Sequence, residues 1–411
     1  MTNEQKNVPQ LRFPEFEEKW VKKKLENIAS FGKGKSLSKK DISEEGYSCI
    51  LYGELYTKYG PITTKVYSKT NNIDKKLVYS DKNQVLIPSS GETDIDIATA
   101  TCINVSEKII IGGDLNIITP KIADGRFISL YINGKGKYNL AKYAQGKSVV
   151  HLYNSDIKKL EFFLPKEINE QEKIGDFFSK LDRQIELEEQ KLELLEQQKK
   201  GYMQKIFSQE LRFKDENGND YPDWIKMKLD DIANYRRGSF PQPYGNKEWY
   251  DEVHGEPFVQ VIDVDKNMKL HKQTKQKISD LAKPKSVKGF IGDIVVTLQG
   301  SIGRVAILQY DAYIDRTLLL INSFKIEMNK DYFKYVLYTL FSKEKERAPG
   351  GTIKTITKAV LSNFKIDIPA IEEQKKIGDF FNKIDDFIEV QVNKIELLKQ
   401  RKQGLLQKMF I

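Results

Sequence analysis

The chain has 411 residues, which exceeds the size of one ordinary domain and predicts two or three domains. No apolar run approaches the length of a membrane span, the N-terminus lacks the layout of a signal peptide, and two cysteines, Cys49 and Cys102, are too few for a disulfide framework. We therefore expect a cytoplasmic protein with no membrane association. The formal net charge of +9 fits nucleic-acid binding, although a generally Lys-rich proteome would produce much of the same charge.

Two short segments with related sequences precede the two globular parts of the chain. The first begins with Leu11-Arg12-Phe13 and the second with Leu211-Arg212-Phe213. The agreement continues through Trp20 with Trp224, Leu25 with Leu229, Ile28-Ala29 with Ile232-Ala233, and Gly34 with Gly238. The second copy carries an insert with a turn signal at Asn217-Gly218. We expect the tryptophan and leucine of each copy to be core anchors.

The globular regions, residues 36–160 and 239–364, share little sequence, but both contain short apolar runs between turn residues. Such runs predict strands at Cys49–Tyr52, Val85–Ile87, Lys108–Ile111, Leu115–Ile118, Phe258–Ile262, Ile294–Leu298, Val305–Leu308 and Leu318–Ile321. Short helices are predicted at Arg126–Ile132, Lys137–Ala144 and Asp331–Arg347. Each region ends in an edge strand closed by a proline, at residues 160–165 and 364–369. The pattern indicates a mixed α/β globule, not a doubly wound sheet.

Each globular region is followed by a long segment, Ile168–Phe207 and then Ile371–Phe410, and more than half of the positions of the two segments are identical. Apolar residues recur in both at alternating steps of four and three, which is the a/d pattern of a coiled coil. The seam of the first copy runs through Ile174, Phe178, Leu181, Ile185, Glu188, Leu192, Leu195, Lys199, Tyr202 and Ile206, and that of the second includes Ile388, Gln391, Ile395, Leu398, Lys402 and Leu405. A narrow seam favours a long straight partner, and the other copy is the obvious one. The alternative is that each helix packs on its own globular domain.

Polar residues within the seam favour an antiparallel helix pair. A parallel pair would stack Lys199 beside Lys402, whereas an antiparallel pair can set Glu188 opposite Lys402 and Lys199 opposite Gln391. In this register Leu192 meets Leu398 and Leu195 meets Ile395.

The order of the segments predicts an α+β protein with a pseudo-two-fold internal repeat. Two α/β domains alternate with two long helices that form an antiparallel coiled coil. The expected boundaries are residues 1–165 for the first domain, 166–208 for the first helix, 209–369 for the second domain and 370–411 for the second helix. Similar parts of one chain serve a shared structural role, and divergent parts in equivalent places indicate two different ligands.

Motifs of catalytic sites are missing from the sequence. Gly32–Ser36 contains Gly-Lys-Ser, but Ala29 stands where a phosphate-binding loop needs its first glycine. The three histidines, His151, His254 and His271, are dispersed, and with two isolated cysteines they do not form a zinc pattern. The acidic turn at residues 91–96 could bind a metal ion, or its carboxylates could simply be exposed to solvent. We expect no catalytic residue, no metal and no cofactor in this chain.

Several loops combine cations, glycine and small polar residues, a composition that suits DNA. Loops around Lys147-Ser148 and residues 350–354 precede the last strand of each region, where lysine can neutralise phosphates. Loops that follow equivalent strands, at residues 89–92 and 299–304, carry side chains that can hydrogen-bond to base edges. The basic pairs at the start of each region are more suited to phosphate contacts. For each loop, the alternative is a plain β-turn with no role in binding. The candidates are Lys33, Lys35, Ser90, Gly91, Lys147, Ser148, Arg236, Arg237, Gln299, Ser301, Arg304, Thr352 and Lys354.

Both long segments contain the motif E-Q-x-K-I-G-D-F-F-x-K-[LI]-D, followed by E-L-L-x-Q-x-K-x-G-x-x-Q-K. In this motif and in its layout, the chain resembles the specificity subunit of type I restriction–modification systems. The resemblance implies two target recognition domains, each of which reads half of a split site in double-stranded DNA, and a helical spacer between them. It also implies that two methyltransferase subunits dock on the spacer and that restriction subunits join them. S-adenosylmethionine, ATP–Mg²⁺ and the methylation of adenine would belong to those partners.

Two other interpretations stay open. The first is a non-catalytic adaptor whose paired helices bridge other proteins without reading DNA, and salt-dependent binding of duplex DNA separates this interpretation from the specificity subunit. The second is the specificity half of a fused restriction–methylation enzyme. That interpretation requires S-adenosylmethionine and nuclease motifs, which the sequence does not show.

Overall fold

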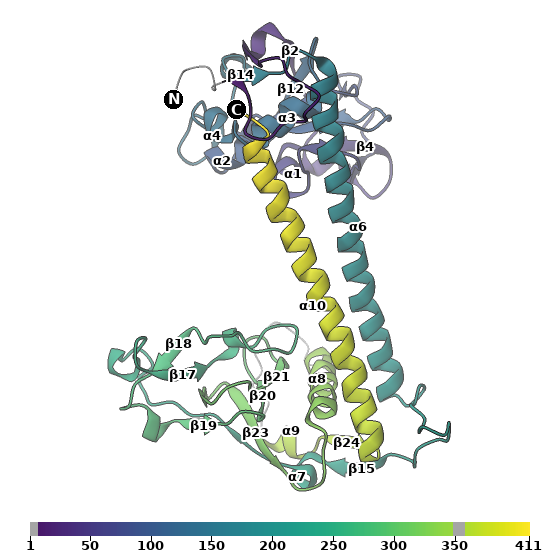
Figure 1. Ribbon diagram of the computed structural model, residues 1–411, viewed down its shortest axis with the longest axis vertical. Helices are drawn as coiled ribbons and strands as arrows, with labels where there is room; N and C mark the ends of the chain where they lie inside the picture. The colour runs from purple at the N-terminus through teal and green to yellow at the C-terminus, as the bar shows by residue number, and fades with distance from the viewer. Residues whose placement is uncertain (1–6, 348–357) are drawn as a thin grey trace. The chain divides into compact units, whose positions relative to one another are not determined.

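A computed structural model describes residues 7–347 and 358–411 (Figure 1). The chain divides into a first unit, residues 1–190 with 393–411, and a second unit, residues 191–392. The predicted long helices are present as α6 (Ile168–Phe207) and α10 (Ile371–Lys408). One part of each helix belongs to the first unit and the other part to the second. Across the described residues, no helix is both long enough and apolar enough to cross a membrane.

The first unit contains two five-stranded sheets. One has the order β2 (Ala29–Lys33), β12 (Leu115–Pro120), β8 (Val85–Pro88), β10 (Thr101–Ile103) and β5 (Ile62–Thr63). The other has the order β3 (Ile42–Ser43), β6 (Ser68–Thr70), β4 (Tyr47–Ile50), β11 (Ile110–Ile111) and β7 (Val78–Tyr79). Two short pairs are added, β1 (Val21–Lys24) with β14 (Glu161–Leu164) and β9 (Ser90–Gly91) with β13 (Val150–His151). Its short helices are α1 (Tyr52–Thr57), α2 (Asp94–Ile97), α3 (Gly125–Asn133), α4 (Lys137–Ala141) and α5 (Asn154–Ile157).

The second unit contains two four-stranded sheets. One has the order β16 (Ala233–Arg237), β23 (Leu318–Phe324), β20 (Ile294–Thr297) and β21 (Val305–Ile307). The other has the order β18 (Gln276–Ile278), β17 (Glu256–Val259), β22 (Ala312–Ile314) and β19 (Val287–Gly289). A short pair joins β15 (Ile225–Lys228) to β24 (Lys365–Ile368). Its further helices are α7 (Leu229–Ile232), α8 (Lys330–Arg347) and α9 (Lys358–Ser362).

The two units share one sheet topology, although their sequences in these regions are unlike. The series β2-β12-β8-β10 matches β16-β23-β20-β21, and all neighbours in both are antiparallel. The series β6-β4-β11-β7 matches β18-β17-β22-β19, and in both the central pair alone is parallel. The predicted internal repeat therefore extends through the globular regions as a shared sheet topology, although their sequences show little similarity.

Most strands lie where the apolar runs predict them, but β4 ends two residues and β17 three residues earlier than expected. The strand predicted to reach Tyr52 ends at Ile50, and Tyr52 begins α1 instead. The reason is a helical cap, because Glu54 Oε2 accepts a hydrogen bond of 3.0 Å from the backbone N–H of Leu51. The second unit repeats this arrangement after β17, where a buried aspartate caps a short helical turn. The capping side chain satisfies a backbone N–H group at the start of the helical turn, so the chain does not need to continue as a strand to pair that group.

A buried glutamate at the start of α6 holds the N-terminal segment of the first unit. Glu170 is 1% exposed and accepts hydrogen bonds from Arg12 Nε at 2.7 Å and from Trp20 Nε1 at 3.1 Å. The hydrogen bond to Glu170 raises the pKa of the Arg12 guanidinium above its ordinary value. The same segment continues into β1, which pairs antiparallel with β14 just before α6. Trp20 is thus a core anchor, as predicted.

The second unit repeats this junction at the start of α10. Glu373 is fully buried and accepts hydrogen bonds from Arg212 Nη2 at 2.8 Å and from Trp224 Nε1 at 3.0 Å. The strand that follows Trp224, β15, pairs antiparallel with β24 just before α10. The arginine and tryptophan of each N-terminal segment and the glutamate of the helix motif therefore form one interaction, which occurs twice.

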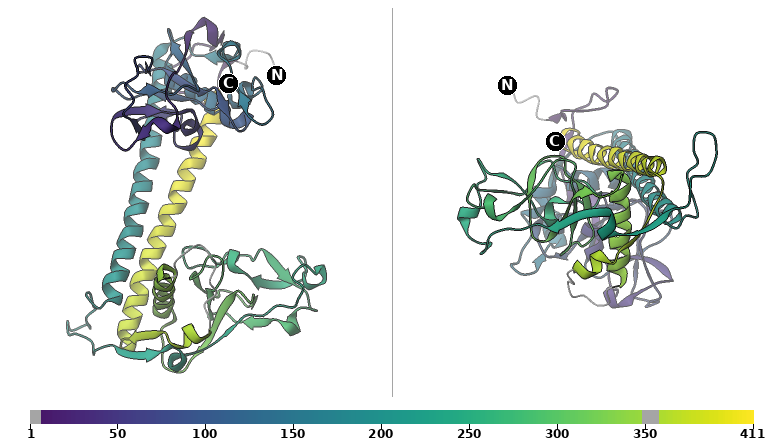
Figure 2. Two further views of the ribbon diagram at one scale, coloured as in Figure 1. Left: turned by 180° about the vertical axis from the view of Figure 1, so that it is seen from behind. Right: turned by 90° about the horizontal axis from the view of Figure 1, so that it is seen from below.

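Within each unit, α6 and α10 lie side by side and run antiparallel, as Figures 1 and 2 show. In the first unit, ion pairs join Lys394 to Glu188 at 2.5 Å, Lys399 to Glu189 at 2.6 Å, and Lys402 to Asp182. In the second unit, Lys199 Nζ lies 2.5 Å from Asp385 Oδ1. The antiparallel direction is as predicted.

The predicted register of the helix pair needs correction. Lys402 pairs with Asp182 rather than Glu188, and Lys199 pairs with Asp385, which is not the partner that the prediction gave it. The prediction considered only strict a/d positions, and the two aspartates lie beside that seam. The expected contacts of Leu192 with Leu398 and of Leu195 with Ile395 would join residues of different units, and they stay predictions.

The apolar face of each helix also drifts from the predicted seam towards its C-terminal end. Tyr202 is 40% exposed, and its ring makes a T-shaped contact with the ring of Phe380, with 5.1 Å between the two centroids, whereas the neighbouring Met203 is buried. In α10 the same change buries Leu406 more than Leu405. A straight α-helix has 3.6 residues per turn, so a strict seven-residue repeat loses its phase along the helix. The other described seam residues are buried or half-buried, including Leu181, Ile185, Ile388, Ile395 and Leu398.

Candidate functional site

The candidate residues of the first unit gather at one end of the β2-β12-β8 sheet. Lys33 is the last residue of β2, and its partner across the ladder is Asn116 near the start of β12. The neighbouring strand, β8, ends at Pro88, so Ser90 follows at the same end of the sheet. Lys33 and Lys35 are exposed to solvent, whereas Ser90 is half-buried.

A loop that carries Lys147 and Ser148 is brought to the same place. It is closed by two backbone hydrogen bonds between Gln145 and His151, of 2.9 Å and 2.7 Å. The strand that follows, β13, pairs with β9, so that His151 lies opposite Ser90 and its Nδ1 is 3.2 Å from the Ser90 hydroxyl. Gly91, the other residue of β9, lies opposite Val150. Lys147 and Ser148 are exposed to solvent, whereas Ser90 is half-buried.

The equivalent end of the second unit carries a different set of side chains. Arg236 and Arg237 are exposed residues at the end of β16, where Arg237 lies opposite Leu319. On the other side of β23, β20 ends at Thr297, and the chain continues to Gln299. The ends of β16 and β20 therefore flank the start of β23, and they bring Arg237 and Gln299 to one end of the sheet.

Ser301 and Arg304 lie in the loop between β20 and β21. Thr297 closes this loop, since its N–H donates to the Arg304 carbonyl at 2.9 Å and its hydroxyl donates to the Ser301 carbonyl. The guanidinium of Arg304 is half-buried, and its Nη1 donates to the backbone carbonyl of Val264 at 2.9 Å. This contact favours a role for Arg304 in holding the loop. Thr352 and Lys354 lie outside the described residues.

Two equivalent glycines, Gly34 and Gly238, fix how the chain leaves β2 and β16. A Cβ atom on Gly34 would lie 1.9 Å from the carbonyl oxygen of Gly112, and one on Gly238 would lie 2.2 Å from that of Ile314. The chain passes this closely over the link between the two sheets, at the position where the candidate residues gather. The sequence parallel between Gly34 and Gly238 therefore has a steric cause.

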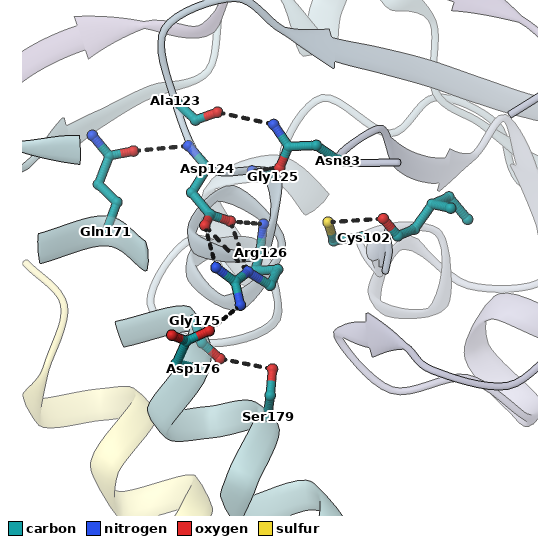
Figure 3. Close-up of polar contacts among 11 residues, drawn as sticks. Asn83, Cys102, Ala123, Asp124, Gly125, Arg126, Gln171, Gly175, Asp176 and Ser179 are labelled. Atoms are coloured by element: carbon teal, nitrogen blue, oxygen red, sulfur yellow. Dashed lines mark hydrogen bonds and ion pairs between the residues drawn. The ribbon is translucent and has the colours of Figure 1, made fainter. Parts of the chain in front are cut away.

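Figure 3 shows an ionic cluster at the start of α6 that the sequence did not single out. Arg126 of α3 binds Asp124 through Nη2 at 2.7 Å and binds Asp176 of α6 through Nη1. Burial alone would lower the pKa of Arg126, but its hydrogen bonds to the two carboxylates raise it above the ordinary value. A Cβ on Gly175 would lie 2.9 Å from Arg126 Nε, so this glycine of the motif makes room for the arginine.

The glutamine of the helix motif completes the same junction. Gln171 accepts a hydrogen bond of 3.0 Å from the N–H of Asp124 (Figure 3). It also donates one of 2.9 Å to the carbonyl of Pro165. In the second unit, Gln374 makes the equivalent contacts with the N–H of Asn329 and the carbonyl of Pro369, both at 2.9 Å. The motif E-Q-x-K-I-G-D therefore joins the long helix to its globular region.

Within the part of the chain that the structure describes, no group of three or more His, Cys, Asp or Glu side chains is placed to hold a metal ion. The acidic turn at residues 91–96 is a helix cap. The hydroxyl of Thr93 accepts a hydrogen bond of 3.1 Å from the N–H of Asp96, at the start of α2. Capping accounts for Thr93 and Asp96, whose side chains also hydrogen-bond to each other.

The fold and the paired loop clusters define a duplicated scaffold that presents two different polar surfaces. Residues 17–197 and 221–400 each match the family described as Type I restriction modification DNA specificity domain. The two matches cover more than half of the chain, so the chain belongs to this family.

Relatives and solved structures agree with this assignment. The type I restriction enzyme MjaVIII specificity subunit of Methanocaldococcus jannaschii is 26% identical over 431 residues, which cover 98% of this chain and 93% of the relative. The fold resembles the S subunit of a type I restriction–modification system from M. genitalium, with a TM-score of 0.61, 16% identity, and 98% and 99% of the two chains covered. A chain from a study of complex assembly in the type I R-M system has a TM-score of 0.57 at 16% identity, with 96% and 98% covered.

Proposed function

We propose that this chain is the DNA specificity subunit of a type I restriction–modification complex and that each globular region reads one half of a bipartite site. One observation carries the proposal. The two units share a sheet topology, but equivalent ends of that topology present different side chains. The first end presents Lys33, Ser90 and Lys147, whereas the second presents Arg237 and Gln299. A repeated scaffold with unlike polar surfaces suits two unlike DNA sequences.

The chemistry of these surfaces fits DNA. Exposed cations neutralise phosphates and position the duplex, which carries no sequence information by itself. Lys33, Lys35 and Lys147 would serve this role in the first unit, and Arg236 and Arg237 in the second. Ser90, Ser148, Gln299 and the backbone of the adjoining loops would then face base edges.

In this proposal the chain supplies recognition and its partners supply chemistry. The two recognition domains span residues 1–165 and 209–369, and the helices at 166–208 and 370–411 form the spacer. Two methyltransferase subunits, which carry S-adenosylmethionine, dock on the spacer and methylate adenine. Restriction subunits with ATP–Mg²⁺ join them. The two related helices α6 and α10, which repeat one motif, support the assignment of two equivalent docking surfaces.

Methylome sequencing tests the proposal. A host strain that encodes this chain should methylate adenine within a two-part motif, and deletion of the gene should remove that methylation alone. Purified chain should also bind duplex DNA with an affinity that falls as salt rises. An adaptor protein that does not read DNA would leave the methylome unchanged, and its binding to duplex would not depend on sequence.

A further inference from the structure

Arg316 lies at the end of the second unit's sheet that also presents Arg237 and Gln299, and it differs from the other arginines at this end. Arg316 lies in the link between β22 and β23, where the neighbouring Thr317 accepts a backbone hydrogen bond of 2.8 Å from Leu298 N–H, just before Gln299. Its side chain is exposed, and its Cζ lies 4.7 Å from the centroid of the Tyr244 ring. Nothing in the sequence around Arg316 singles it out, since it follows a buried strand like many surface cations.

A buried aspartate fixes the ring on which Arg316 rests. The hydroxyl of Tyr244 donates to Asp315 Oδ2, and Asp315 is 2% exposed. The other oxygen, Oδ1, accepts from the backbone N–H of Thr317 at 2.8 Å and from the Thr317 hydroxyl. Burial and then the hydrogen bond to Asp315 raise the pKa of Tyr244, so its hydroxyl stays protonated and keeps donating. The residues on both sides of Arg316 are therefore held in place.

The guanidinium itself is left with its polar edge available. The Arg316 guanidinium lies over the ring of Tyr244, whereas the Arg304 guanidinium of the same end donates to the Val264 carbonyl. Arg316 also lines an open hollow with a volume of about 410 Å³. The other lining residues are Tyr244, Gln260, Val261, Ile262, Asp315 and Thr317. This hollow leaves room beside the guanidinium for a flat group.

We propose that Arg316 contacts the O6 and N7 atoms of a guanine in the major groove, so that the DNA half-site of the second unit contains a G·C pair at a fixed position. The inference rests on the proposed function and names one of its base contacts. A planar guanidinium matches those two acceptors with two hydrogen bonds, which is the commonest specific contact between arginine and DNA. Stacking on Tyr244 orders the side chain before DNA arrives, which lowers the entropy lost on binding.

The test uses the complete complex of this chain with its methyltransferase partner and duplexes in which each base pair of the methylated motif is changed in turn. Wild-type complex should show a G·C pair in one half of the motif, and Arg316→Ala should lose the preference for that pair by about tenfold to a hundredfold. Preferences at all other positions should stay as they are. Arg316→Lys should keep part of the preference, and Tyr244→Leu, which removes the stacked ring, should weaken the same position.

Arg304→Ala is the matched control, because its guanidinium is engaged with the backbone, and it should lower stability without altering the preference for that pair. A uniform loss of methylation across all duplexes by Arg316→Ala would show a phosphate contact and overturn the inference. An unchanged motif, or a motif whose affected half lacks G·C, would overturn it as well. If the wild-type complex showed no sequence preference at all, the proposed function itself would fall.

Discussion

Lys199 of α6 and Asp385 of α10 form an ion pair in the second unit, with Nζ 2.5 Å from Oδ1. Lys402 of α10 and Asp182 of α6 form the corresponding pair in the first unit. The long helices begin at equivalent residues, so the two lysines occupy equivalent positions, and so do the two aspartates. Each helix therefore gives its lysine in one unit and its aspartate in the other, which is the contact pattern of an antiparallel pair built from two copies of one segment.

Asp385→Ala should lower the free energy of unfolding by about 3 kcal/mol, because it leaves the half-buried ammonium group of Lys199 without its carboxylate partner. Asp385 is 8% exposed, and it also accepts a hydrogen bond of 2.7 Å from the Tyr335 hydroxyl of α8, a helix that lies beside α10 in Figure 2. Urea unfolding of the full chain measures the change. The exposed neighbour is the control, and Asp386→Ala should stay within about 0.5 kcal/mol of wild type. Equal effects of the two substitutions would contradict the role of the buried pair.

Glu373→Ala should also destabilise the chain, by about 3 kcal/mol, since it removes the acceptor shared by Arg212 and Trp224. Glu373 is fully buried, whereas the adjacent Glu372 is exposed and belongs to the same turn of the helix. Glu372→Ala therefore serves as the matched control and should change little. The same urea experiment compares them, and protection of the β15–β24 amides from hydrogen exchange should fall in the first variant only.

Gly238→Ala should disrupt the second unit locally, because the new Cβ would lie 2.2 Å from a backbone oxygen that cannot move without the sheets. Gly34→Ala should do the same in the first unit. Gly245 and Gly60 have open space where a Cβ atom would lie, so alanine at these positions tests the general effect of removing a glycine. Thermal unfolding should show a lower midpoint for the first two variants alone. A normal midpoint for Gly238→Ala would mean that the backbone crossing relaxes easily.

The stability of the first unit should fall with rising pH in the alkaline range because of Cys49. Burial raises the pKa of the Cys49 thiol to about 11, above the value of about 8.5 for a thiol in an unfolded chain. The folded state therefore keeps a proton that the unfolded state loses. Its contribution to stability is complete below pH ~8.5 and is lost as the pH rises to ~11. Urea unfolding across this window should show a shallower fall for Cys49→Ala, and an identical fall in both proteins would refute the assignment.

The sequence was sufficient to predict the long helices, their antiparallel direction, and the strands β14 and β24 that precede them. Those features depend on the spacing of apolar residues, on repeated sequence motifs and on the charged residues within the helix seam, all of which can be read directly from the sequence. The register was wrong because the lysine of each helix can reach an aspartate such as Asp182 or Asp385 beside the seam. Which carboxylate a lysine contacts depends on how closely the two helices pack and on how they are aligned, and this follows only from the three-dimensional structure.

The shared sheet topology and the surface residues were harder to predict. Many apolar residues can fill a buried strand, so equivalent strands such as β8 and β20 need not resemble each other in sequence. Arg304 looked suitable for a base contact, but its guanidinium is engaged with the Val264 carbonyl. Arg316 was missed because the ring that supports it, Tyr244, is far from it in sequence.

Exchange of one globular region should change one half of the methylated motif and leave the other half intact. The structure supplies the boundaries, because the β1–β14 ladder ends where Leu25 N–H donates to the Leu160 carbonyl at 2.9 Å. In the second unit, Leu229 N–H donates to the Phe364 carbonyl at 3.0 Å at the equivalent point. Residues 26–159 or 230–363 can therefore be replaced by those of another family member while the ladders and the buried glutamates stay in place.

The two exchanges are each other's control. The first should alter one half of the motif, the second should alter the other half, and a chain with both should methylate a motif in which both are new. This result is expected because each set of candidate residues belongs to one sheet end within its own unit, with Lys33, Ser90 and Lys147 in the first and Arg237 and Gln299 in the second. Methylome sequencing of the three strains reads the outcome directly. If a single exchange altered both halves together, recognition would depend on the two regions jointly, and the assignment of one half-site to each would have to be abandoned.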